Sequence, residues 1–324
     1  MAKVKNFKTI FPAVSVPLND DYSINEPEFR AYLRWIKTFY GKGMDGLVCN
    51  GHTGEITGLT RAERKRVVEI CAEECGDVMT IISGVNCENT AESIEMAKEA
   101  KEAGADGILL MPPHMWLRFG MNPDAPFEYV KDVAEGADID IIIHLYPATS
   151  KAFYPVETLI KMCKEIDHVK CIKMGTRVTS IYEHDVRLLR QECQDISLIT
   201  CHDETLCVSW FPGMDGALIG FAGCVPEIIC PAREVFANPD KHTLKEAQDW
   251  SDRIYHISQA IYGGGQPSGE AHARLKEALK QRGIFSSALM RKPVLPLNQE
   301  EKDWVALGLE RSQLPEVDMT QFED

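Results

Sequence analysis

The residue best suited to chemistry in this sequence is a lysine near the end of an apolar segment, residues 169–175. Lys173 alternates with Cys171 and so shares its side of an extended strand, whereas Lys170 lies on the other side. An ammonium group inside a protein is costly unless it is paired or loses its proton. A neutral lysine amine condenses with a ketone to form an imine. The pattern therefore favours Schiff-base chemistry at Lys173, with an outward-facing lysine at a strand end as the alternative.

A second apolar segment, residues 139–147, contains a tyrosine and a histidine on one side. Aliphatic residues occupy the opposite side, which we expect to pack against helices. His144 and Tyr146 are then predicted to point into the interior, with the Tyr146 hydroxyl at the top and able to carry a proton. A rim aromatic without chemical function is the alternative for Tyr146. His144, which lies deeper, is predicted to be a hydrogen-bonded core histidine.

A glycine-rich turn, residues 51–55 (Gly-His-Thr-Gly-Glu), follows the apolar run 46–50. Successive backbone amides in such a turn can point at an anion. The turn is a candidate cradle for a carboxylate or phosphate. An ordinary turn between a strand and a helix is the competing interpretation.

Eight apolar segments alternate with helical patterns and predict an α/β fold, the closed (β/α)8 or TIM barrel. In such a barrel, the carboxyl ends of the strands carry the chemistry, which is where the three candidate segments place their polar residues. Thr60 and Glu63 predict a capping box at one helix start. We expect residues 1–237 to form the barrel and residues 238–324 a helical extension packed on it. The predicted strands are 9–18, 46–51, 80–86, 107–113, 139–147, 169–175, 197–203 and 216–222.

Composition excludes several classes of protein. The 324 residues carry 35 Lys and Arg against 49 Asp and Glu, a formal net charge of -14, which disfavours nucleic acid and anionic membranes as partners. The sequence has no long uncharged apolar run and no signal peptide in its first residues, so we expect a cytoplasmic protein. The 11 cysteines are expected to be reduced thiols, and no metal site is predicted.

These segments, in this order, resemble the dihydrodipicolinate synthase / N-acetylneuraminate lyase family of lysine-dependent class I aldolases and dehydratases. The resemblance implies a (β/α)8 barrel with carboxyl-terminal helices, a homotetramer, and no cofactor other than the covalent imine. The matching segments run through residues 11–14, 51–55, 145–146, 172–173, 216–217, 276–279 and 291–297.

The resemblance also implies roles for individual residues. Lys173 would form the Schiff base with the ketone of a 2-oxo acid such as pyruvate, and Tyr146 would be the general acid and base. Thr53, with the backbone amide of His52, would bind the carboxylate. The remaining residues expected to contact substrate are Gly51, Gly54, Trp116, Ile219 and Phe221.

The sequence departs from the family pattern at three places. The biosynthetic synthase carries an arginine for a second carboxylate after the tyrosine, and residues 146–151 (Tyr-Pro-Ala-Thr-Ser-Lys) lack it; neither Lys151 nor Arg177 stands at the matching position. Met115 and Trp116 look more like the hydratase-aldolase branch, which cleaves arylidene-pyruvates, although Trp116 could instead pack at the rim or at a subunit contact. His52 is an unusual imidazole that could bond substrate, act as acid or base, or cap the loop.

The leading hypothesis is a pyruvate-releasing or pyruvate-adding aldolase, with or without a hydration step, whose substrate has an apolar or aromatic distal part. A 2-oxo-3-deoxy sugar acid dehydratase is the main alternative, favoured by the polar residues at 150–151 and 202–204. A dihydrodipicolinate synthase-like condensation would use the same imine. A non-catalytic oxo-acid sensor is disfavoured because it would need neither Lys173 nor Tyr146.

Overall fold

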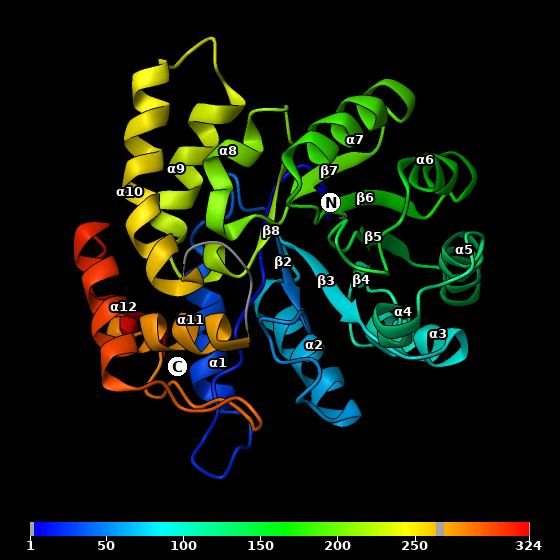
Figure 1. The fold of residues 1–324 in the computed structure, drawn as a ribbon. Helices are drawn as coiled ribbons and strands as arrows, with labels where there is room; N and C mark the ends of the chain where they lie inside the picture. The colour runs from blue at the N-terminus through cyan, green and yellow to red at the C-terminus, as the bar shows by residue number, and fades with distance from the viewer. Residues whose placement is uncertain (1–2, 264–268, 324) are drawn as a thin grey trace.

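The computed structural model describes residues 3–263 and 269–323, and it contains a parallel eight-stranded barrel (Figure 1). The strands pair in the order β1-β8-β7-β6-β5-β4-β3-β2, and a parallel bridge between Ala13 and Val48 joins the two ends. The predicted (β/α)8 fold is confirmed. The strands are β1 (Ile10–Pro12), β2 (Gly46–Cys49), β3 (Thr80–Val85), β4 (Gly107–Leu110), β5 (Asp140–His144), β6 (Val169–Met174), β7 (Ser197–Thr200) and β8 (Gly216–Ile219).

Helices cover the outside of the barrel, and three more follow it. At the start of α2, the Thr60 side chain accepts from the Glu63 amide while the Glu63 carboxylate accepts from the Thr60 amide, as the predicted capping box requires. The helices are α1 (Glu26–Lys37), α2 (Arg61–Cys75), α3 (Thr90–Glu102), α4 (His114–Phe119), α5 (Ala125–Ala137), α6 (Val156–Glu165), α7 (Thr179–Glu192), α8 (Leu206–Trp210), α9 (Pro226–Ala237), α10 (Leu244–Tyr262), α11 (Gly269–Gln281) and α12 (Gln299–Arg311).

Alternation along the strands separates two apolar cores. In β5, Ile141 and Ile143 belong to the large core between strands and helices, whereas Ile142 faces the barrel interior. Tyr146, two residues beyond the strand, also packs in that interior. The other buried residues of the interior core are Phe11, Ala13, Val48, Ile82, Leu109, Met111, Ala152, Cys171, Ile199 and Leu218.

The strands are shorter than predicted because the chain leaves the sheet soon after it passes the barrel rim. The first predicted strand, 9–18, contributes only Ile10–Pro12, although the residues that follow are buried as well. The backbone segments that follow β5 and β6 approach each other closely at the carboxyl ends of these strands. A Cβ at Gly175 would lie 1.9 Å from the Leu145 carbonyl oxygen, so only glycine fits there. This close approach brings the chain beside Tyr146 next to the end of the Lys173 strand.

The carboxyl-terminal helices α10, α11 and α12 pack on one side of the barrel, beside α1 and α9 (Figure 1). Apolar residues at helical spacing, including Ile254, Ile257 and Leu275, are buried beneath them. All 11 cysteines are free. Over the described ranges, no helix is long and apolar enough to cross a membrane.

Candidate active site

Lys173 lies at the carboxyl end of β6, where its Cα pairs with that of His144 in β5. Cys171, two residues earlier, is in the interior core, so Lys173 also faces inward. Lys170 is exposed and donates to the Asp167 carbonyl at 2.6 Å, which removes it as a competitor for the interior. Burial is the main cause that lowers the pKa of Lys173 below its ordinary value. A larger share of the amine is therefore neutral near neutral pH.

Tyr146 is buried beside two histidine rings. Its hydroxyl lies 3.4 Å from His52 Nε2, and its ring meets His144 edge to face with centroids 4.9 Å apart. Burial raises the pKa of the phenol, so Tyr146 is protonated in the resting site. The prediction that His144 is a hydrogen-bonded core histidine is wrong in part: it is buried, but Nδ1 has no partner among the described residues.

The loop after β2 contains backbone N–H groups that have no hydrogen-bond acceptor among the described residues. Amides 51–54 donate to no acceptor in the described part of the chain, whereas the Glu55 amide bonds the His52 carbonyl at 3.0 Å. Thr53 is buried, and a Cβ at Gly220 would lie 2.7 Å from Thr53 Oγ1. Gly54 also leaves little space for a side chain, since a Cβ there would lie 3.0 Å from the Val14 carbonyl oxygen. A Cβ at Gly51 would make only ordinary contacts. Unused amides beside a hydroxyl can bind a carboxylate.

A buried ion pair fixes this loop to the carboxyl-terminal extension. Glu55, in left-handed conformation with φ 58°, pairs with Lys276 of α11, and the two side chains are 8% and 1% exposed. The second Glu55 oxygen accepts from the Arg291 amide at 3.0 Å. Lys276 also donates to the Leu289 carbonyl at 2.8 Å. Strained backbone held by buried partners is common at functional sites, and here it sets the position of Thr53.

Trp116 of α4 packs against the interior core and against two other aromatic rings. Its ring centroid is 5.6 Å from that of Tyr129 and 6.2 Å from that of Tyr154. Ile219 and Phe221 pack in the helix-side core, and Phe221 contacts Tyr262 there at 6.2 Å. Alternation along β8 turns Leu218 inward and Ile219 outward, so the side chains of Ile219 and Phe221 pack on the helix side and not in the barrel interior where they were expected to meet substrate.

Two further residues influence the electrostatics of the site, and the sequence did not single out either of them as central. His272 of α11 has its pKa lowered to about 4, mainly by burial, with Lys173 among the charges that contribute. Burial raises the pKa of Asp203, just after β7, to about 6. The charge of Asp203 in turn raises the pKa of Lys173. No signal near position 272 separated it from the other polar residues of an amphipathic helix. In the described part of the chain, no cluster of His, Cys, Asp and Glu has the makings of a metal site.

Two basic residues near the barrel rim, Arg177 and Lys151, already have hydrogen-bond partners within the protein. Arg177 donates to Glu204 at 2.6 Å and to the Gly175 carbonyl at 2.9 Å. Lys151 is exposed and donates to the Arg118 carbonyl at 2.8 Å. Neither side chain is set out to receive a second carboxylate, in line with the missing arginine.

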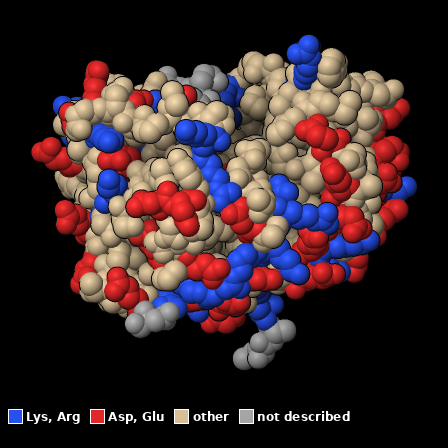
Figure 2. Space-filling model, turned by 90° about the horizontal axis from the view of Figure 1, so that it is seen from below, with Lys and Arg blue, Asp and Glu red and all other residues tan. Residues whose placement is uncertain are grey.

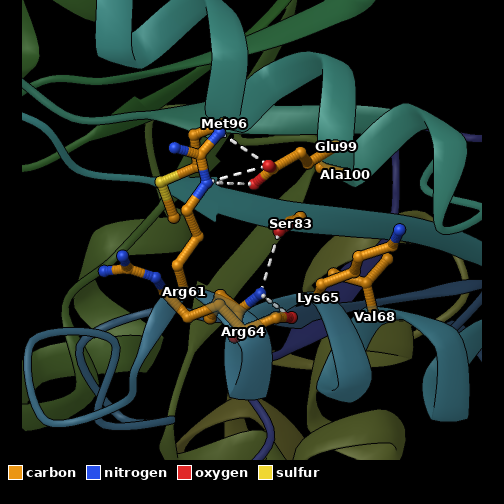
Figure 3. A pocket seen from close by; sticks show the side chains of 9 residues that line it. Arg61, Arg64, Lys65, Val68, Ser83, Met96, Glu99 and Ala100 are labelled. Carbon is orange, nitrogen blue, oxygen red and sulfur yellow. Dashed lines mark hydrogen bonds and ion pairs between the residues drawn. The ribbon is translucent and has the colours of Figure 1, made fainter.

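A small polar cavity lies outside the barrel between α2 and α3 (Figure 3). Arg61 turns toward Glu99, which it contacts at 2.8 Å, and Asn50 donates to Ser83 Oγ at 3.1 Å. The Asn50 Oδ1 has no partner among the described residues, and the space admits about a single water molecule. The cavity is too small for a substrate.

Comparison with known proteins agrees with this geometry. Residues 6–311 match the model of the Dihydrodipicolinate synthetase family. A 4-hydroxy-tetrahydrodipicolinate synthase of Bartonella bacilliformis is 26% identical to this chain, and the match covers 95% of this chain and 98% of the relative. An uncharacterized DapA-like lyase of Pyrococcus horikoshii is 30% identical, and the match covers 90% of this chain and 95% of the relative.

Solved structures share the fold. YagE, an E. coli K12 prophage protein of the dihydrodipicolinic acid synthase family crystallised with pyruvate, aligns with a TM-score of 0.84 at 20% identity over 95% of this chain and 99% of its own. The dihydrodipicolinate synthase of Aquifex aeolicus aligns with a TM-score of 0.83 at 19% identity, over 96% of this chain and 100% of its own. Members of the family are lyases of the aldolase type. The chain belongs to the Dihydrodipicolinate synthetase family and is an enzyme of that class.

Proposed function

We propose that this enzyme is a class I, Schiff-base-forming aldolase that releases pyruvate from a 2-oxo acid or adds it to an aldehyde. The observation that carries the proposal is the inward-facing Lys173 at the carboxyl end of β6, with its pKa lowered by burial and Tyr146 following the adjacent strand. Pyruvate in the YagE crystal supports a 2-oxo acid as the ligand.

The cleavage reaction follows from these positions. Lys173 Nζ attacks the ketone carbon C2, water leaves, and a protonated imine forms. The C4 hydroxyl gives its proton to the Tyr146 oxygen while the Tyr146 hydroxyl passes its own proton to His52 Nε2, 3.4 Å away. The C3–C4 bond breaks, and its electron pair moves to the imine nitrogen to give an enamine and an aldehyde. The free amides beside Thr53 hold the substrate carboxylate. Because the imine is itself the electron sink, the proposal requires no other cofactor.

The aromatic group at the mouth favours a hydratase-aldolase of arylidene-pyruvates. Trp116, with Tyr129 and Tyr154 against it, borders the interior core at the tops of β4 and β5. A flat aromatic ring on the distal part of a substrate would stack there with favourable contact. In this reaction water adds across the C3–C4 double bond before the same bond is cleaved.

A 2-oxo-3-deoxy sugar acid dehydratase is the second candidate. His202, Asp203 and Glu204 follow β7 and would suit substrate hydroxyl groups, although Glu204 is paired with Arg177. Condensation of the dihydrodipicolinate synthase type is supported by the names of relatives, but the engaged Lys151 and Arg177 speak against a second carboxylate. A binding protein without activity would not require the lysine.

We also propose a homotetramer. Exposed apolar side chains gather on α4, around α8, and on α10 and α12, and two different self-complementary interfaces generate a tetramer with dihedral symmetry; we assign these interfaces to α4 and α8. On α4, Met115 is 50% and Phe119 71% exposed; around α8, Val208 is 62% and Phe211 63% exposed. On the face in Figure 2, acidic and basic side chains are intermixed and form no broad basic patch, which agrees with a small-molecule substrate instead of nucleic acid or membrane.

A substrate panel tests the proposed activity. Purified enzyme is incubated with arylidene-pyruvates, 2-oxo-3-deoxy sugar acids and N-acetylneuraminate, and separately with pyruvate plus aspartate semialdehyde, and pyruvate release or consumption is followed. We expect turnover of arylidene-pyruvates and its loss in Lys173→Met. Turnover of the sugar acids alone would select the second candidate, and no turnover of any member would reject the aldolase proposal.

A further inference from the structure

A cavity of about 230 Å³ lies between α11 and the segment of residues 287–297, which we call the strap. Apolar side chains form much of its wall, among them Met290 and Val294 of the strap. Lys173, Tyr146 and Thr53 are not in its lining. The cavity is therefore separate from the proposed active site.

Three lysines surround this cavity, one each from α11, the strap and α12: Lys280, Lys292 and Lys302. Their ammonium groups form no ion pair with any residue that the structure describes, in a chain whose net charge is -14. The acidic residue in the lining, Glu277, is buried and accepts from Gln281 Nε2 at 2.9 Å. Unpaired positive charge around an apolar space favours an anion with an apolar body.

Tyr22 adds an aromatic wall to the cavity. Its backbone is left-handed, with φ 67°, and its carbonyl accepts from Arg291 Nη2 at 2.7 Å, so the strap holds this residue in place. The strap runs below α11, beside the loop that carries Tyr22 (Figure 1). Aromatic rings pack on one another in offset or edge-to-face arrangements. An aromatic monocarboxylate matches both the ring and the lysines.

The strap also fixes the loop proposed to bind the substrate carboxylate. The Leu289 carbonyl accepts from Lys276 Nζ at 2.8 Å, and the Arg291 amide donates to Glu55 at 3.0 Å. Leu289 itself lines the cavity. A ligand that bridges α11 and the strap restrains both contacts. It thereby favours the arrangement of the loop that positions Thr53.

We propose that this cavity is a regulatory site for an aromatic monocarboxylate, with the carboxylate among the three lysines and the ring against Tyr22 and the strap. The bound ligand strengthens pyruvate binding, because it stabilises the strap that positions the loop after β2; this second part rests on the proposed function. Since linkage is reciprocal, pyruvate strengthens the binding of the carboxylate by the same factor.

Benzoate is the probe for the site. Calorimetry measures its binding to enzyme that has been reduced with pyruvate at Lys173, so that the active site is already filled. We expect one benzoate per chain, with an affinity that falls as salt is added. Benzamide keeps the ring without the charge, and acetate keeps the charge without the ring. Each should bind at least about tenfold more weakly than benzoate.

Two variants test the position of the site. Lys292→Gln combined with Lys302→Gln removes two cations and should weaken benzoate binding about tenfold, whereas Lys241→Gln, an exposed lysine outside the cavity, is the matched control and should not. Ala288→Phe fills the cavity and should abolish binding, with urea unfolding as the check that the variant folds.

The regulatory effect is measured on the natural enzyme. Benzoate should lower the pyruvate concentration for half-maximal trapping about fivefold, the lower end of typical coupling between sites. In Ala288→Phe, benzoate should leave that concentration unchanged.

Several results would overturn the inference. Benzoate that does not bind the reduced enzyme, or that binds the double lysine variant as tightly as the natural enzyme, rejects the site. Binding that leaves the half-saturating pyruvate concentration unchanged or raises it rejects the regulation. Leu295, at the cavity, is 74% exposed, and a smaller assembly in Leu295→Glu would make the occupant a second copy of the chain instead.

A failure of the proposed function is distinguishable from a failure of this site. A natural enzyme that traps no pyruvate rejects the Schiff-base function. Benzoate binding to Lys173→Met, and its loss when Ala288→Phe is added, then still reports on the cavity.

Discussion

At the scale of residues, two lysines three positions apart have opposite environments. Lys170 is exposed and bonded to a nearby carbonyl, whereas Lys173 faces the interior and has its pKa lowered by burial. The acidic residue Asp203 works against this shift, since its carboxylate raises the pKa of Lys173. Burial lowers the pKa of Lys173, Cys201 and Asp203 oppose that effect and Arg177 adds to it, and together these groups set the pH at which the nucleophile becomes available.

Asp203→Asn should move the pH dependence of imine formation to lower pH. Removing the carboxylate removes an influence that raises the pKa of Lys173, so the neutral amine persists further into the acidic range. The amide oxygen can still accept from the Phe221 amide, which Asp203 Oδ1 does now at 2.9 Å. The rate of pyruvate trapping by cyanoborohydride, measured across pH, gives the midpoint. Asp195→Asn, exposed before β7, should leave the midpoint unchanged; a shift to higher pH in Asp203→Asn would contradict the assignment.

At the scale of elements, the loop after β2 depends on a helix more than two hundred residues away. Glu55 in that loop pairs with Lys276 of α11, and both are buried. The carboxyl-terminal extension therefore does more than cover the barrel. It fixes the turn that carries Thr53 and His52.

Lys276→Met should destabilise the fold and weaken pyruvate binding. It leaves the buried Glu55 carboxylate without its partner, which typically costs about 3–5 kcal/mol of unfolding free energy. The double variant Glu55→Gln with Lys276→Met should recover much of that loss. Denaturant unfolding and the pyruvate concentration for half-maximal trapping measure the two effects. Arg61→Met, at the exposed pair with Glu99, is the control and should change neither. An unaltered Lys276→Met enzyme would refute this role for the ion pair.

Most of the fold and the core of the candidate site could be predicted from sequence. Period-two alternation placed Tyr146 inside the barrel, and the spacing of eight apolar runs predicted the closed sheet. Strand ends were predicted too long, since a buried residue beyond the rim looks the same in sequence as one inside the sheet. The approach of His272 and the contact of Gly220 with Thr53 depend on tertiary packing between distant segments, which no local pattern encodes.

At the scale of the whole molecule, a net charge of -14 surrounds a site proposed to bind an anion. The local amides after β2 must outweigh this long-range repulsion, which salt screens within about 8 Å at physiological ionic strength. The exposed apolar surfaces on α4 and α8 are the other feature of this scale. They are separate in sequence, on helices that follow β4 and β7.

Phe211→Glu should convert the proposed tetramer into a dimer. A buried carboxylate would disrupt the interface at α8 while leaving the one at α4 intact. Native mass spectrometry and light scattering measure the mass of the assembly. Leu244→Glu, at an exposed apolar residue at the start of α10, is the matched control and should remain tetrameric. A natural enzyme that is monomeric, or a Phe211→Glu enzyme that is still tetrameric, would contradict the model.

The most direct measurement is covalent trapping of pyruvate. With borohydride present, intact mass should increase by one reduced pyruvate per chain, and peptide mapping should find it on the tryptic fragment that contains Lys173 and ends at Arg177. Lys170→Met should keep the adduct and Lys173→Met should lose it. An adduct on another lysine, or none at all, would contradict the claim that the buried amine of β6 is the nucleophile.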